Sequence, residues 1–145
     1  MNQTASATRD LARRLLAREA GEGEPPGERG QAASRACEKL RVHLSKLVGV
    51  AGFQALLARA LAPAKDEVAW LDAVRVLADG SLEGFSEAAQ TQETDEATEG
   101  GLALLAQLLG LLVTFVGEAL TLRLLQDVWP DAPLNDPNAI VEEIA

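Results

Sequence analysis

The sequence predicts an all-α fold: a helical bundle of about four main helices with a long apolar C-terminal helix. Almost half of the 145 residues are apolar, and they are mainly Ala, Leu and Val, with three Phe, two Trp and no Tyr. Ala and Leu are strong helix formers, whereas the aromatic residues that favour strands are scarce. Apolar residues also recur at three- and four-residue steps along several segments, which is the period of a helix buried on one face.

Three amphipathic segments predict the shorter helices. A loop is expected over 21–30, GEGEPPGERG, where Gly, Pro and charged residues show no periodicity. Gly49 begins a tight connection between the second and third helices, and Pro63 is expected to end the third, because proline lacks the N–H that a helix interior needs. The predicted spans of these helices are about 5–20, 31–48 and 51–62.

A small irregular or hairpin insertion is expected near 68–85. Apolar and polar residues alternate there ahead of an Asp79-Gly80 pair, which is typical of a β-hairpin turn. A helix over 67–77 followed by a turn accounts for the same residues, so both arrangements stay open.

The last helix is the most apolar part of the chain. Residues 86–99 are polar and acidic and are expected to form a loop that enters this helix, with Thr94 as its N-cap. The helix is predicted to run to about Trp129. From Leu102 to Val116 it is apolar nearly all round, a pattern that indicates a helix surrounded by other helices.

The length corresponds to about one ordinary domain. We expect residues 1–130 to form a single helical domain. Residues 131–145 are rich in Pro, Asp and Asn and are expected to form a mobile acidic tail. No internal repeat is evident from the sequence.

The apolar stretch is expected to be too short to cross a membrane. A span needs about 20 mainly apolar residues, whereas Leu102–Val116 has fifteen, with Glu118 and Arg123 following in the same helix. The first residues are polar and do not resemble a signal peptide. We therefore predict no membrane span and a cytoplasmic location. Arg outnumbers Lys ten to three and Ala is abundant, a composition that suggests a bacterial source.

The charge argues against two classes of partner. The formal net charge is −9, and both nucleic acids and anionic lipid surfaces attract cationic proteins. We therefore expect neither as a partner. The charge is also uneven: residues 1–48 hold nine basic and six acidic groups, whereas residues 49–145 hold four basic and sixteen acidic groups.

Small residues recur along one face of the last helix. A glycine inside a helix costs about 1 kcal/mol relative to alanine, so two glycines on this face suggest close contact with another backbone. That backbone belongs to the same chain, to a second copy in a homodimer, or to a different protein. The candidate interface residues are Ala103, Leu108, Gly110, Leu112, Thr114, Phe115 and Gly117, with Glu118 and Arg123 as candidate polar contacts.

Catalytic chemistry is not indicated. The single cysteine, Cys37, and the single histidine, His43, point in different directions on one predicted helix and do not form a nucleophile–base pair. No metal or cofactor motif is present, so we expect no cofactor. The predicted function is a non-enzymatic protein–protein interaction module: an adaptor, regulatory or assembly subunit with a leucine-rich helical surface. Two alternatives are an enzyme that uses scattered carboxylates and a binder of an apolar small molecule or lipid between helices, lined by Leu108, Leu112 and Phe115.

Overall fold

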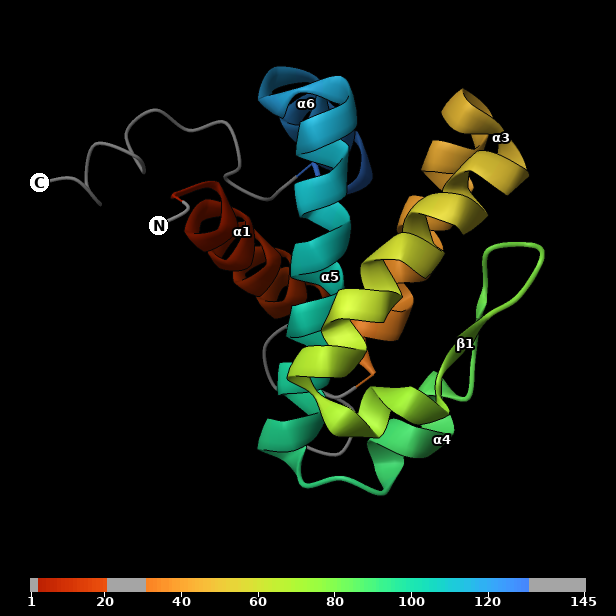
Figure 1. Ribbon diagram of the computed structural model, residues 1–145. Coiled ribbons are helices and arrows are strands. Elements are labelled where there is room, and N and C mark those ends of the chain that lie inside the picture. Colours follow the sequence, from red (N-terminus) through yellow and green to blue (C-terminus); the bar gives the residue numbers. More distant parts are fainter. Residues whose placement is uncertain (1–2, 21–30, 131–145) are drawn as a thin grey trace, which may run out of the picture.

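The computed structural model describes residues 3–20 and 31–130. Five α-helices pack together in the described residues, with only a two-stranded sheet beside them (Figure 1), which confirms the predicted all-α bundle. In chain order the elements are α1 (Gln3–Ala20), α3 (Ala32–Glu67), the 3-10 helix η1 (Ala69–Ala73), β1 (Arg75–Val76), β2 (Leu82–Glu83), α4 (Phe85–Gln90), α5 (Thr94–Val116) and α6 (Glu118–Val128).

The second and third predicted helices form one element, α3, that is bent at Gly49. This residue has φ 82° and ψ 162°, which is far from helical. The chain folds back there: a Cβ placed on Gly80 would lie within 3.5 Å of both Phe53 and Arg41, one from each arm. The prediction that Pro63 ends the helix is wrong. Burial of Leu61 and Ala64 on either side of Pro63 holds the second arm helical to Glu67, which offsets the lost main-chain hydrogen bond.

The last helix is broken where the sequence predicted continuity. α5 ends at Val116, Gly117 has φ 90° and ψ 160°, and α6 turns back from it. Thr94 is the first residue of α5 and Glu93 its N-cap, so the predicted cap lies one position too late. The sequence pattern suited a single helix because one internal glycine costs only about 1 kcal/mol.

Of the two arrangements left open for the insertion near 68–85, the structure shows the hairpin. β1 and β2 are antiparallel, with Arg75 opposite Glu83. Gly80 has φ 85°, which suits the turn, and the Asp79 carboxylate accepts a hydrogen bond from the Ser81 N–H at 2.9 Å. The region predicted as a loop over 86–99 contains the short helix α4 and the first turns of α5 instead.

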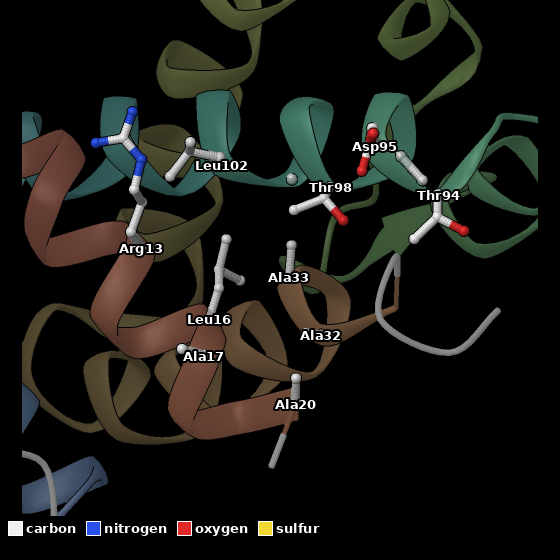
Figure 2. Close-up of a pocket in the computed structure, with 12 residues that line it drawn as sticks. Arg13, Leu16, Ala17, Ala20, Ala32, Ala33, Thr94, Asp95, Thr98 and Leu102 are labelled. Carbon is white, nitrogen blue, oxygen red and sulfur yellow. The ribbon is translucent and has the colours of Figure 1, made fainter. Parts of the chain in front are cut away.

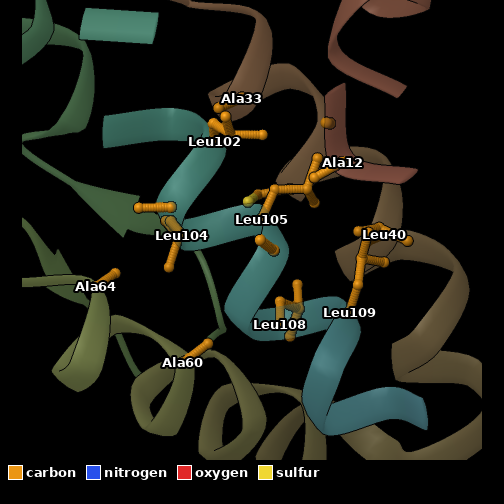
Figure 3. Close-up of a cluster of buried hydrophobic side chains, with 14 of the residues drawn as sticks. Ala12, Ala33, Leu40, Ala60, Ala64, Leu102, Leu104, Leu105, Leu108 and Leu109 are labelled. Carbon is orange, nitrogen blue, oxygen red and sulfur yellow. The ribbon is translucent and has the colours of Figure 1, made fainter. Parts of the chain in front are cut away.

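The core is centred on α5, which lies between α1 and the two arms of α3. Figure 3 shows its leucines with Ala12 and Leu40 on one side and Ala60 and Ala64 on the other. Residues 100–106 of α5 are all buried. The apolar character that the sequence shows all round this helix therefore reflects neighbours on several sides. The predicted loop 21–30 and the predicted mobile tail 131–145 lie outside the described residues.

The expectation that no segment is able to span a membrane is wrong. Both α3, Ala32–Glu67, and α5, Thr94–Val116, are long and apolar enough to cross a bilayer. The core helix of a soluble fold also has this length and composition, so the buried share of each helix is the informative quantity. Within its most apolar window, α5 is 50% buried inside the fold and α3 only 28%. Much of this apolar helix surface therefore faces outward.

Candidate docking face

Two glycines form sharp bends of the same shape between helical segments, and we call each of these bends a corner. Gly49 (φ 82°, ψ 162°) and Gly117 (φ 90°, ψ 160°) are each flanked by helical residues. Because main-chain dihedrals set the direction of the chain, nearly equal values at both glycines give nearly equal bends. This part of φ/ψ space is open almost only to glycine. The two corners are thus specified by glycine itself. Among the described residues, apart from the glycine and its neighbours in the chain, no atom lies within 4 Å of a Cβ placed at either position.

The residues around the corners match when the chain is shifted by 68 positions, the difference between 117 and 49. Val48-Gly49-Val50-Ala51 corresponds to Val116-Gly117-Glu118-Ala119, and Leu56-Leu57 to Leu124-Leu125. Only seven of the 30 positions in 32–61 and 100–129 are identical, too few to show a repeat by sequence alone. Nine matched pairs are buried on both sides, and five of them lie close to the corners: Leu40 and Leu108, Leu44 and Leu112, Phe53 and Thr121, Leu57 and Leu125, and Leu61 and Trp129. The chain therefore contains two helix–corner–helix units.

Large apolar side chains are exposed at both corners. Leu47 and Phe115, which occupy matched positions just before each Val-Gly pair, are 61% and 56% exposed. Both corners lie at the end of the molecule farthest from α4 (Figure 1). We call the exposed apolar set at this end the corner face: Leu47, Val48, Val50, Phe115 and Leu120.

Basic residues flank the corner face, and acidic residues gather at the opposite end. Residues 42–62 and the matched residues 110–130 contain three basic groups, Lys46, Arg59 and Arg123, against two acidic groups, Glu118 and Asp127. The Arg59 guanidinium lies over the Phe115 ring at 5.8 Å from its centroid. The end of α3, η1, α4 and the start of α5 (residues 63–73 and 84–99) contain one lysine and eight carboxylates: Asp66, Glu67, Asp72, Glu87, Glu93, Asp95, Glu96 and Glu99.

The structure separates the predicted interface residues into two groups. Ala103, Leu108 and Leu112 are buried in the core of the same chain. The others lie at or near the α5–α6 corner, where Thr114 donates a hydrogen bond to the Gly110 carbonyl at 2.9 Å. Leu108 and Leu112 thus point into the core, whereas Phe115 is exposed, so the three do not line a common cavity. The members of the outer group are Gly110, Thr114, Phe115, Gly117, Glu118 and Arg123.

Close helix packing through glycine occurs at positions that the sequence analysis missed. A Cβ on Gly101 would lie 2.5 Å from the Ala33 Cβ, and a Cβ on Gly100 would overlap the Trp70 ring. Trp70 in turn donates its indole N–H to the Glu96 carbonyl at 2.9 Å. At Gly110, by contrast, no described atom lies within 4 Å of a Cβ. The adjacent Gly-Gly pair was the available signal for this contact between α3 and α5.

Glu19 ties the C-terminal end of α1 to α3 and α6. Its carboxylate, which is only 7% exposed, accepts hydrogen bonds from Lys39 at 2.7 Å, Arg35 at 3.2 Å and the Trp129 indole at 3.2 Å. Burial by itself raises the pKa of Glu19, but the hydrogen bonds from Lys39, Trp129 and Arg35 outweigh it and hold the pKa below its ordinary value. Because the Glu19 carboxylate is paired with Lys39 and Arg35, we assign this cluster a structural role.

A pocket of about 400 Å³ lies between α1, the start of α3 and the start of α5. Figure 2 shows that its wall is largely alanine and leucine, with Arg13 and Asp95 as its charged members. Two lining residues, Ala20 and Ala32, flank the segment 21–30 that lies outside the described residues. The pocket therefore borders an undescribed part of the chain.

Cys37 and His43, the two residues considered for catalysis in the sequence, lie in structural environments. Cys37 is buried, which raises the pKa of its thiol to about 12, and His43 Nδ1 lies 3.1 Å from the carbonyl oxygen of Lys39. Among the described residues, no group of three His, Cys, Asp or Glu side chains is placed to hold a metal ion. Comparison with protein-family models, curated proteins and solved structures gave no match.

Proposed function

We propose that this chain is a non-enzymatic interaction module, an adaptor, regulatory or assembly subunit, that acts by burying the corner face against a partner surface. The observation that carries this proposal is the exposure of Leu47 and Phe115 at matched positions of the two units. Exposed apolar clusters with a polar rim are typical of interaction sites. The proposed mechanism is still burial of apolar helix surface, but the surface is now the corner face, formed by α3 and the α5–α6 corner, and not the middle of the last helix.

Two further features support the corner face as the functional surface. Both corners are held by a glycine conformation that few other residues adopt. A loop with polar residues is the ordinary way to connect two helices at a surface, yet each corner instead presents valine beside leucine or phenylalanine. Burial of these side chains on a partner removes apolar area from water, which is the main favourable term in association.

A site-specific cross-linking experiment tests the proposal. A photoreactive amino acid replaces Leu47 or Phe115 in the full chain, expressed in the cells that make the protein. Gln90, which is exposed at the end of α4, carries the same group as a control. We expect positions 47 and 115 to give adducts, with a protein or with a lipid, that position 90 lacks. If all three positions give the same pattern, or if positions 47 and 115 give no adduct, the corner face is not a docking surface.

A further inference from the structure

We infer that the partner of the corner face is an anionic membrane surface, with the two corners inserted at the level of the lipid headgroups. This inference rests on the proposed function and names the partner of the same surface. It does not require either helix to cross the bilayer.

The shape of the face favours lipid. Gly49 and Gly117 are the turning points of two folded-back helical units, so the backbone forms a convex tip at each corner (Figure 1). Leu47 and Phe115, beside these tips, are exposed. Leu47 to Ala51 are five consecutive exposed residues without a charge. A protein partner needs a pocket complementary to each tip, whereas the headgroup region of a bilayer deforms around them. Amphipathic segments in this position bury their apolar residues about 5–10 Å deep.

The arrangement of charge favours an anionic surface and fixes an orientation. Lys46, Arg59 and Arg123 flank the corner face, against Glu118 and, farther along α6, Asp127. Cations at the rim of an apolar tip are attracted to anionic headgroups while the apolar side chains enter the interface. Two of the eight carboxylates at the opposite end, Glu67 and Glu99, pair with Arg9. The other six repel the same surface, so the molecule has one favourable orientation, with α4 pointing away from the membrane.

The net charge of −9, which argued against anionic lipid, does not oppose this orientation. α5 has 23 residues, and the 22 steps from Asp95 to Gly117 measure about 33 Å at 1.5 Å per residue. Electrostatic screening in physiological salt has a length of about 8 Å. The acidic end is thus about four screening lengths from a surface that touches the corners. The local charge at the corner face therefore decides the attraction.

Vesicle binding with a single labelled position tests the inference. Leu47→Cys in the full chain accepts an environment-sensitive fluorophore selectively, because the natural Cys37 is buried. Gln90→Cys, labelled in the same way, is the control. With vesicles of phosphatidylcholine that contain phosphatidylserine, we expect a blue shift and brightening at position 47 and no change at position 90. Vesicles of phosphatidylcholine alone should bind less, and added salt should weaken binding to the anionic vesicles.

Variants with altered charge provide a second test. Each basic group near an anionic surface contributes about fivefold to binding, so Lys46→Glu with Arg123→Glu should weaken anionic-vesicle binding at least tenfold. Lys65→Glu, a lysine at the acidic end, should leave it unchanged. Absence of binding to either vesicle type, equal effects of the two charge changes, or equal label responses at 47 and 90 would overturn the lipid inference. If cross-linking at position 47 then yields a protein adduct, the docking function stands and its partner is a protein.

Discussion

Gly110 and Gly117 offer a direct test of why glycine occurs in this helix. The sequence pattern places both on one small-residue face and predicts that larger side chains disrupt packing at each. The structure predicts opposite outcomes for substitution by alanine. Gly110 lies inside α5 and Gly117 at the corner, and no described atom lies within 4 Å of a Cβ at either position. Steric overlap is therefore excluded as the cause of any difference between them.

The expected magnitudes follow from the backbone. At Gly110 the helix gains from alanine, which is worth about 1 kcal/mol over glycine in a helix interior. At Gly117 an alanine must adopt φ 90° and ψ 160°, and such a conformation costs a residue with a side chain about 1–3 kcal/mol. Gly110→Ala should therefore stabilise the fold and Gly117→Ala destabilise it. The two variants should differ by about 2–4 kcal/mol in the free energy of unfolding.

Urea unfolding followed by far-UV circular dichroism measures this difference. The midpoint should rise for Gly110→Ala and fall for Gly117→Ala, with the slope unchanged. Gly49→Ala, at the matched corner, should resemble Gly117→Ala because the two glycines share their dihedrals. Destabilisation by Gly110→Ala would show that the glycine serves close packing after all. A neutral Gly117→Ala would refute the argument from backbone strain.

Three further predictions concern the core and the Glu19 cluster. Gly100→Ala should destabilise the fold and alter tryptophan fluorescence, because its Cβ would overlap the Trp70 ring; an unchanged spectrum and melting temperature would contradict this contact. Glu19→Gln should lower the free energy of unfolding at neutral pH, because the hydrogen bond and ion pair with Lys39 are weakened. The pKa of Glu19 in the folded chain lies below its ordinary value of 4.5. The stabilisation by the ionised carboxylate is therefore present above pH 4.5 and lost as the pH falls through the folded pKa. The unfolding curves of the variant and the natural chain should converge in acid, and a constant difference would argue against the ion pair. Cys37, with its pKa raised to about 12 by burial, should resist thiol reagents in the folded chain and react on unfolding, and rapid reaction of the folded chain would show that the thiol is accessible.

Local sequence patterns determined most of the helical segments, although they missed α4 and the first turns of α5. Apolar residues at helical spacing located α1, both arms of α3 and the body of α5, and the Asp79-Gly80 pair indicated the hairpin as one of two arrangements. These features depend on neighbours a few residues away, so one segment at a time is enough to recognise them. The apolar character of α5 also indicated correctly that other helices surround it, because only burial on several sides makes such a composition favourable.

The tertiary structure alone decided what the glycines do and where apolar surface stays exposed. The same residue type turns the chain at Gly49 and Gly117, admits a neighbour at Gly101, and meets empty space at Gly110. These roles differ in backbone dihedrals and in contacts with residues distant in sequence, which composition and spacing do not encode. Leu108 and Phe115 are both apolar residues of α5, yet one is buried and the other exposed. Only the packing of α1 and α3 against α5 separates the core from the corner face, because burial is a property of the assembled fold.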